Sequence, residues 1–188
     1  MKNNLKIRLA ADLQSDSIVD GLGIRTVIWT QGCRHFCPGC HNPSTFSFDD
    51  GELFDVDVIK EKIANLKYQD GITFSGGDPF YQPEACADIA KYIHTLNMNV
   101  WCFTGYTFEE LLDLCDPNVM AFLKEIDVLI DGPFKKEKKS FDIKFRGSSN
   151  QRIIDVQKSL QAGKVITIDL DEEEENHNYG REDHKLYI

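Results

Sequence analysis

Four short apolar segments are separated along the chain by patterns typical of amphipathic helices. The segments lie near residues 24–30, 72–74, 99–103 and 127–130, and the helical patterns cover 56–67, a stretch from about 83, 107–115 and 118–125. This alternation favours parallel strands joined by crossover helices, so the sequence predicts an α/β fold. Two further strands are predicted near 152–156 and 164–168.

Each of the four apolar segments ends in a loop that carries reactive or glycine-rich residues. In chain order the loops contain three cysteines, Gly-Gly-Asp-Pro, Thr-Gly-Tyr and Asp-Gly-Pro. Sites in α/β sheets and barrels form at the carboxyl ends of strands, so we expect these loops to meet on one rim. A closed eight-stranded barrel typically needs about 250 residues, and this chain has 188. We therefore predict a partial, open (β/α) barrel of about five or six mostly parallel strands.

The length and composition fit one globular domain. We assign residues 1–168 to it and residues 169–188 to an acidic, mobile tail, because six carboxylates lie between residues 169 and 175. The net charge of −10 argues against a general nucleic-acid binder. The chain has no apolar run of membrane-spanning length and no apolar signal core at its N-terminus, so we expect a cytoplasmic protein that does not enter a membrane.

Three of the six cysteines lie within eight residues, at the spacing Cys-x3-Cys-x2-Cys. In the cytoplasm, clustered thiols more often bind metal or catalyse than form disulfides. Soft thiolates select zinc or iron–sulfur clusters. A structural zinc ion needs four ligands, and the fourth would have to be His35, His41 or a distant residue. A four-iron cluster held by three thiolates would instead keep one iron open for chemistry. The spacing alone leaves both possibilities.

The motif Gly76-Gly77-Asp78-Pro79 follows the second apolar segment. Taken alone, it is more typical of an ordinary turn between a strand and a helix. Beside a cysteine loop, the two glycines would let the backbone approach a ligand closely, and Asp78 would offer a carboxylate to an ammonium group.

The cysteine loop and the later Gly-Gly-Asp-Pro together resemble those of the radical S-adenosylmethionine superfamily. Residues 20–25 and 40–43 narrow the resemblance to the activases of glycyl radical enzymes. The short length and residues 101–107, 127–134 and 145–152 resemble the activases that serve anaerobic ribonucleoside-triphosphate reductases. The resemblance covers residues 7–168 and leaves the acidic tail outside.

The resemblance implies that Cys33, Cys37 and Cys40 ligate three irons of a [4Fe-4S] cluster, while S-adenosylmethionine chelates the fourth. It implies further contacts to the cofactor. Gly76, Gly77 and Asp78 would hold the methionine amino group, and Gly39, Cys40 and His41 would line the adenine side. Thr104 and Asp131 are the weaker candidates, for the ribose or carboxylate region. Asp20 and Arg25 would help to position an incoming peptide.

The resemblance also implies a reaction and partners. Reductive cleavage of S-adenosylmethionine would give methionine and a 5′-deoxyadenosyl radical, which takes hydrogen from a backbone glycine of the reductase. No side-chain acid or base is expected. The implied partners are the glycyl radical subunit of the anaerobic ribonucleotide reductase and a reduced flavodoxin or ferredoxin as electron donor, with no direct contact to nucleic acid.

Two alternative functions are kept beside this one. The first is a pyruvate formate-lyase type activase or another small radical enzyme, against which the short chain argues. The second is a zinc-stabilised binding module, which would need a fourth ligand close to the three cysteines.

The remaining cysteines and a lysine cluster receive ordinary interpretations. Cys86 and Cys115 lie on helical apolar stripes and Cys102 lies within a strand, so all three are predicted to be small buried side chains. Residues 135–139 contain four lysines and one glutamate and are predicted to form an exposed loop.

Overall fold

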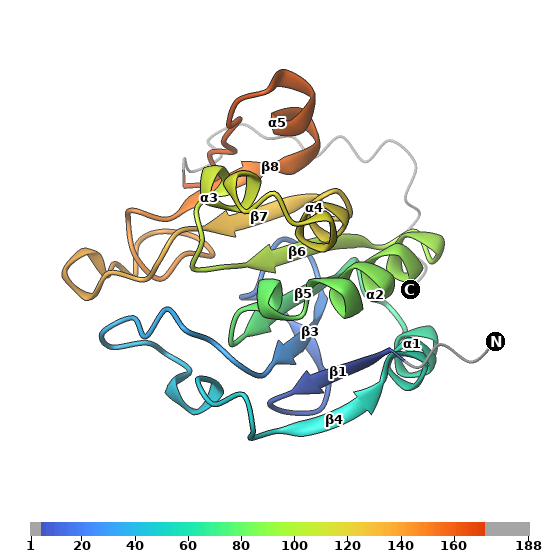
Figure 1. The fold of residues 1–188 in the computed structure, drawn as a ribbon. Coiled ribbons are helices and arrows are strands. Elements are labelled where there is room, and N and C mark those ends of the chain that lie inside the picture. Colours follow the sequence, from blue (N-terminus) through green and yellow to red (C-terminus); the bar gives the residue numbers. More distant parts are fainter. Residues whose placement is uncertain (1–4, 172–188) are drawn as a thin grey trace, which may run out of the picture.

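The computed structural model describes residues 5–171, whose strands form a single eight-stranded sheet (Figure 1). The strands are β1 Lys6–Leu9, β2 Gln14–Ser17, β3 Arg25–Thr30, β4 Glu52–Asp55, β5 Gly71–Gly76, β6 Asn99–Phe103, β7 Val128–Asp131 and β8 Arg152–Asp155. The α-helices are α1 Val56–Ala64, α2 Pro83–Thr95, α3 Phe108–Asp113, α4 Pro117–Leu123 and α5 Val156–Ala162. Short 3-10 turns occur at Pro43–Thr45, Pro79–Tyr81 and Lys136–Lys138.

The centre of the sheet is parallel, as the sequence predicts. Strands β3, β5, β6 and β7 are neighbours in that order, and each pair is parallel. Parallel neighbours need a crossover, and each of these three connections contains at least one helix. The pairs Thr30↔Gly76 and Phe103↔Ile130 align the carboxyl ends of the strands. The four loops therefore emerge on one rim, and the prediction of a mostly parallel, open α/β fold is confirmed.

Antiparallel strands extend both edges of this parallel centre. β1 pairs with β3 and β4, β2 pairs with β3, and β8 pairs with β7. The strand order runs from β4 to β8 without closing, so the barrel is open. The predicted number of strands was too low because β1, β2 and β4 are four-residue strands, of which β2 (Gln-Ser-Asp-Ser) has no apolar pattern.

The two faces of the sheet differ in what covers them. Every second residue of the central strands points to the same face of the sheet. Ile28, Phe74 and Val100 thereby enter the main core, which α1, α2 and α4 cover from one side (Figure 1). The intervening residues face the concave side, where only a small apolar cluster forms around Trp101, Ile130 and Ile153. The concave face thus retains room for a site.

Several local signals act as predicted. Pro83 occupies the first turn of α2, where its missing N–H is not needed. Thr107 and Glu110 form the capping box of α3. Cys86 and Cys102 are fully buried, which confirms the interpretation of these two thiols.

The prediction for Cys115 is wrong. Its backbone adopts a left-handed conformation with φ of 51°, α3 ends at Asp113, and the Cys115 side chain is exposed. The helix predicted over 107–115 therefore ends two residues earlier than expected, and Cys115 lies outside it.

The end of the chain departs in two ways from the expected elements. The strand expected near 164–168 is reduced to an isolated bridge between Ile154 and Thr167, and α5 was not predicted. Leu170 packs on the small apolar cluster and Asp171 pairs with Arg146, so the folded body extends a few residues past 168. The rest of the predicted acidic tail, residues 172–188, lies outside the described residues. Among residues 5–171, no helix is long and apolar enough to cross a membrane.

Candidate active site

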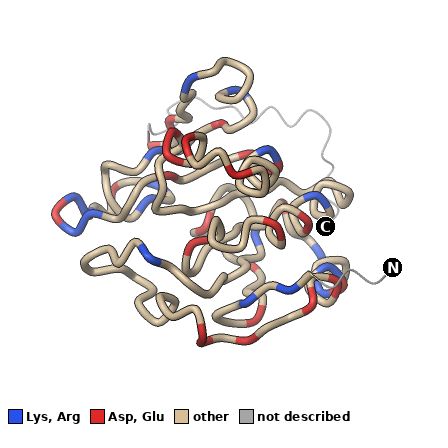
Figure 2. Tube along the Cα trace, in the orientation of Figure 1, with Lys and Arg blue, Asp and Glu red and all other residues tan. Residues whose placement is uncertain are grey.

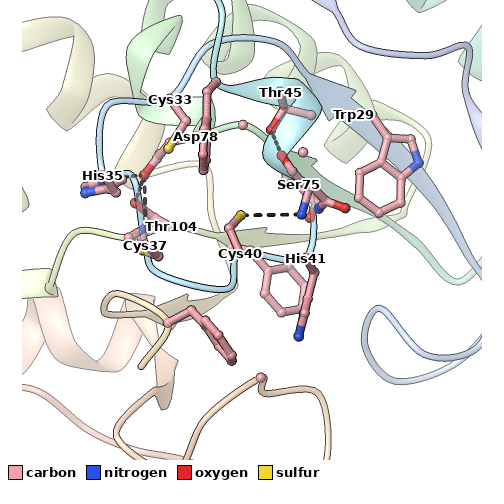
Figure 3. Close-up of a pocket in the computed structure, with 18 of the residues that line it drawn as sticks. Trp29, Cys33, His35, Cys37, Cys40, His41, Thr45, Ser75, Asp78 and Thr104 are labelled. Atoms are coloured by element: carbon pink, nitrogen blue, oxygen red, sulfur yellow. Dashed lines mark hydrogen bonds and ion pairs between the residues drawn. The ribbon is translucent and has the colours of Figure 1, made fainter. Parts of the chain in front are cut away.

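A hollow of about 300 Å³ opens on the concave face where the four rim loops meet (Figure 3). All four loops contribute residues to its lining, from the cysteines after β3 to Gly132 and Phe134 after β7. Of the predicted site residues, those that line it are Asp20, Cys33, Cys37, Cys40, His41, Gly76, Gly77, Asp78 and Thr104. Most of the residues that the sequence predicts for the site therefore lie around one cavity, and Gly39, Asp131 and Arg25 are the predicted residues that do not line it.

The three clustered thiols point into this hollow from a tightly turned loop. Gly39 has a positive φ of 76°, and Cys40 N–H donates to the Cys37 carbonyl at 3.0 Å, so the loop bends back between the second and third cysteine. Burial raises the pKa of the Cys33 thiol to about 11 and also raises that of Cys37. A metal would have to displace these protons, because the thiolate is the form that binds metal.

The chemistry of this donor set fits an iron–sulfur cluster. Within the described residues, no three Cys, His, Asp or Glu side chains are gathered closely enough to hold one metal ion. The thiols instead line a shared space. In a four-iron cluster each thiolate binds a different iron, so three thiols around a hollow suit it better than they suit the closed tetrahedron of structural zinc.

Asp78 has a different position from the expected one. Its side chain is 1% exposed, and its Oδ2 lies 2.7 Å from His35 Nε2 while it also accepts from Thr104 Oγ1 at 2.8 Å and Gly105 N–H at 2.9 Å. Its Oδ1 accepts from Phe80 N–H at 3.0 Å. Both oxygens thus accept hydrogen bonds from the chain itself, and Figure 3 shows His35 and Thr104 beside Asp78. The geometry makes Asp78 a junction of three rim loops, with three donors on Oδ2 and one on Oδ1.

The two glycines before Asp78 are required by packing within the chain. A Cβ atom on Gly76 would lie 2.5 Å from the Thr30 carbonyl oxygen, and one on Gly77 would lie 2.4 Å from the Gly32 oxygen. Gly77 N–H donates to the Thr30 carbonyl at 2.7 Å, and Asp78 N–H donates to that of Gly32 at 2.9 Å. The glycines thus bring the loop after β5 against the start of the cysteine loop, while both still line the hollow.

Asp131 does not line the hollow, and its predicted cofactor contact stays a prediction. Its carboxylate is 1% exposed, accepts from Arg152 through both oxygens, and accepts from Phe108 N–H at 2.8 Å. Through these contacts Asp131, at the end of β7, joins the first residue of α3 to the first residue of β8. In this structure the Asp131 carboxylate links β7 to α3 and β8.

Arg25 likewise does not line the hollow. It begins β3, at the end opposite to the cysteine loop, and is fully buried. Its guanidinium donates to Thr73 Oγ1 at 2.7 Å, to Asn99 Oδ1 at 2.8 Å and to the Ile72 carbonyl at 2.8 Å. Burial lowers its pKa to about 10. The predicted role of Arg25 in peptide positioning stays a prediction, and of the two residues predicted for that role only Asp20 lines the hollow.

Two residues at the site were not predicted as functional. His35 lies edge-on to Tyr106, with ring centroids 4.5 Å apart, and reaches Asp78. Phe134 lies 4.8 Å from the ring of His41 and its N–H contacts Cys37. His35 was considered only as a possible zinc ligand, and Phe134 carried no signal apart from its place after Asp-Gly-Pro.

Comparisons with known proteins identify the family. The family described as a 4Fe-4S single cluster domain matches residues 19–154, which confirms the predicted cluster type. Similar proteins named anaerobic ribonucleoside-triphosphate reductase-activating protein occur in Enterobacteria phage T4 (36% identity over 142 residues), Haemophilus influenzae (37% over 147) and Escherichia coli K12 (36% over 145). These matches cover 71–72% of this chain and 86–90% of the relatives.

A solved structure, QueE from Escherichia coli, is similar over 54% of each chain with a TM-score of 0.43 and 11% identity, too little to carry an argument. The sequence relatives suffice, because they match at more than a third identity over nearly their whole length and share the cluster domain. The chain belongs to the family of anaerobic ribonucleoside-triphosphate reductase-activating proteins, which are enzymes that carry a [4Fe-4S] cluster.

Proposed function

We propose that this chain installs a glycyl radical in an anaerobic ribonucleoside-triphosphate reductase by cleaving S-adenosylmethionine reductively. The observation that carries the proposal is the cysteine loop, which directs Cys33, Cys37 and Cys40 into the hollow at the meeting point of four strand ends. The names of the relatives supply the identity of the enzyme that is activated.

The residues around the hollow suit both cofactors. Cys33, Cys37 and Cys40 would each bind one iron, and the fourth iron would be left for S-adenosylmethionine. When bound and reduced, the cluster supplies the electron that cleaves S-adenosylmethionine into methionine and a 5′-deoxyadenosyl radical. The lining loops at Gly76 and His41 would hold the methionine and adenine ends of the cofactor. Gly39 would lie on the adenine side of the cofactor. Thr104, which donates a hydrogen bond to Asp78, would lie near its ribose or carboxylate region.

The chain contributes shape and exclusion of water. Trp29 and Phe103 line the hollow on the concave face, and Phe134 covers it from the loop after β7. These apolar side chains would help to keep water away from a reactive radical. The open edge of the barrel would admit the target glycine in an extended segment, past Asp20 at the border of the hollow.

The partners follow from this chemistry. The substrate protein is the glycyl radical subunit of the reductase, and the electron comes from a reduced flavodoxin or ferredoxin in the cytoplasm. Residues 1–168 with the adjoining Asp171 contact would act as one unit, and the acidic residues beyond it would not be needed for cluster binding.

An electron paramagnetic resonance experiment tests the proposal. The reduced, cluster-loaded protein is mixed anaerobically with S-adenosylmethionine and either an anaerobic ribonucleotide reductase or a pyruvate formate-lyase. We expect a glycyl radical signal in the reductase alone, and none with a Cys37→Ser variant. A signal in the formate-lyase and not in the reductase would overturn the choice of partner.

A further inference from the structure

The loop between β7 and β8 carries a concentration of positive charge beside the cysteine loop. Residues 133–148 contain six basic and two acidic side chains, in a chain whose net charge is −10. Figure 2 shows these basic residues on a loop that projects from the sheet at the same end as the rim. Lys135, Lys136, Lys138 and Lys139 are all exposed. We refer to residues 135–139 as the lysine loop.

The lysine loop is held in a defined shape. Lys135 N–H donates to the buried Ser148 hydroxyl at 3.1 Å, and Ser149 N–H donates to the Lys138 carbonyl at 2.9 Å. An isolated bridge joins Lys139 to Ser148, and a 3-10 turn spans Lys136–Lys138. The four ammonium groups are therefore presented by an anchored backbone.

The same loop touches the cluster-binding loop. A Cβ atom built on Gly39 would lie 3.3 Å from Cδ of Lys136, so the aliphatic stem of Lys136 runs along the turn between Cys37 and Cys40. Just before the lysine loop, Phe134 N–H contacts Cys37. A protein seated on the lysine loop would consequently lie next to the thiols that bind the cluster.

The charges of the lysine loop are open to a partner. Among residues 5–171, no carboxylate lies within ion-pair distance of Lys135, Lys136, Lys138 or Lys139. Arg146, at the base of the same segment, is paired with Asp171 and does not belong to this open set. With four lysines and the single glutamate Glu137, the lysine loop carries a net positive charge, which raises the association rate of a partner of opposite charge.

We propose that the lysine loop is the docking surface for a small acidic one-electron carrier protein that reduces the cluster. This inference rests on the proposed function, which needs an electron that residues 5–171 do not themselves supply. In the docked complex the carrier is oxidised by one electron and the cluster is reduced by one, with no bond formed or broken. Electron-transfer encounters are typically small, short-lived and driven by charge, which suits exposed lysines better than it suits a stable apolar interface.

Charge reversal with two reductants tests the proposal. The Lys135→Glu/Lys138→Glu variant leaves the Lys136 stem on Gly39, and Lys91→Glu/Lys124→Glu is the matched control, because both control lysines are exposed on the helical side of the sheet. Loss of the cluster's visible absorption is followed anaerobically with reduced flavodoxin, and separately with photoreduced deazariboflavin, which is uncharged. Circular dichroism and iron content check that each variant is folded and loaded.

With flavodoxin, we expect the bimolecular rate of the double variant to fall about tenfold or more at low salt. The Lys135→Gln/Lys138→Gln variant should fall by less, and the rates of wild type and variant should converge as salt rises. With deazariboflavin, both variants and the control should be reduced, and should cleave S-adenosylmethionine, at the wild-type rate.

An unchanged flavodoxin rate in the double variant would overturn the docking proposal. It would also be overturned if the flavodoxin rate held while activation of the reductase, driven by deazariboflavin, fell, because the lysine loop would then serve the reductase. A wild-type protein that fails to cleave S-adenosylmethionine with deazariboflavin would instead refute the proposed function itself, so the two failures are distinguishable.

Discussion

The two ends of the concave face use buried polar groups in opposite ways. At the end where β3 begins, opposite to the rim, Arg25 is fully buried, and its guanidinium is surrounded by Thr73, Asn99 and backbone carbonyl acceptors. At the rim, the thiols of Cys33, Cys37 and Cys40 line an open hollow and receive only weak backbone contacts. A polar group satisfied by its own chain stabilises the fold, whereas one left open toward a cavity is available to a ligand.

Residues that all belong to motifs of the same family differ in whether their polar groups bind within the chain or face the hollow. Arg25 and Asp131 match its motifs as well as the cysteines do, yet their hydrogen bonds are used within the protein. Asp78 lies at the rim but resembles the first group, because His35, Thr104 and Gly105 converge on one of its oxygens. Position on the rim therefore does not by itself make a residue a ligand-binding one.

The largest effect is expected at the open thiols. Replacing Cys33, Cys37 or Cys40 singly by serine should abolish reductive cleavage of S-adenosylmethionine, because a four-iron cluster would lose one of only three protein ligands. Iron content and the formation of 5′-deoxyadenosine measure the result. Cys115→Ser is the matched control, since that thiol is exposed and distant from the hollow. Full cleavage by any of the three rim variants would refute the cluster assignment.

Loss of the Arg25 guanidinium and its hydrogen bonds should chiefly lower the stability of the fold. In Arg25→Met, the Thr73 hydroxyl and the Ile72 carbonyl, both buried, lose their donor, and each buried unsatisfied group costs about 1–3 kcal/mol, whereas water can replace the donor to the exposed Asn99. We expect the free energy of unfolding, measured in urea, to fall by roughly 3 kcal/mol or more. The free energy of unfolding should fall less in Arg25→Lys, because a lysine ammonium group can make some of the hydrogen bonds of the guanidinium.

Arg34→Met, on the exposed part of the cysteine loop, is the control for loss of an arginine. A stable Arg25→Lys protein that binds its cluster but no longer activates the reductase would show that Arg25 contacts the peptide after all.

A smaller effect is expected at the Asp78 junction. In Asp78→Asn, an amide NH₂ group would face at least one of the donors that now converge on Oδ2, so the three rim loops would lose their common contact. The free energy of unfolding should fall by about 1–3 kcal/mol, and the KM for S-adenosylmethionine should rise while iron content is kept. Asp113→Asn at the exposed end of α3 is the control. A variant with normal stability and no binding of S-adenosylmethionine would favour direct contact between Asp78 and the ammonium group.

The smallest effect is expected at the thiols outside the site. Cys115→Ala should change the free energy of unfolding by less than about 0.5 kcal/mol, as an exposed substitution. Cys86→Ala should cost more, because Cys86 is fully buried between α2 and the sheet. In the native protein, iodoacetamide should modify Cys115 and spare Cys86. Rapid labelling of Cys86 would show that the main core opens more readily than its packing suggests.

The arrangement of the rim could be predicted because it follows from a general rule. Apolar segments joined by helices form parallel neighbours, and the carboxyl ends of parallel neighbours share an edge, so Cys33 and Asp78 had to lie close. The edges of the sheet could not be predicted in the same way. A four-residue strand such as β2 contains only polar residues and is formed by pairing with β3.

The use of each polar side chain could not be predicted either. Nothing in the sequence near Asp78 shows that His35 and Thr104, 43 and 26 positions away, would satisfy it. Arginine is seldom fully buried, so the position of Arg25 inside the sheet runs against its residue type. These assignments depend on long-range contacts that only the folded chain reveals.

The most direct test of the account is the content and activity of the wild-type protein, purified and reconstituted under anaerobic conditions. We predict a brown protein with about four irons and four sulfides per chain, as a [4Fe-4S] cluster requires. With S-adenosylmethionine and photoreduced deazariboflavin it should release 5′-deoxyadenosine and methionine. A colourless protein that holds one zinc ion per chain and releases neither product would contradict the account.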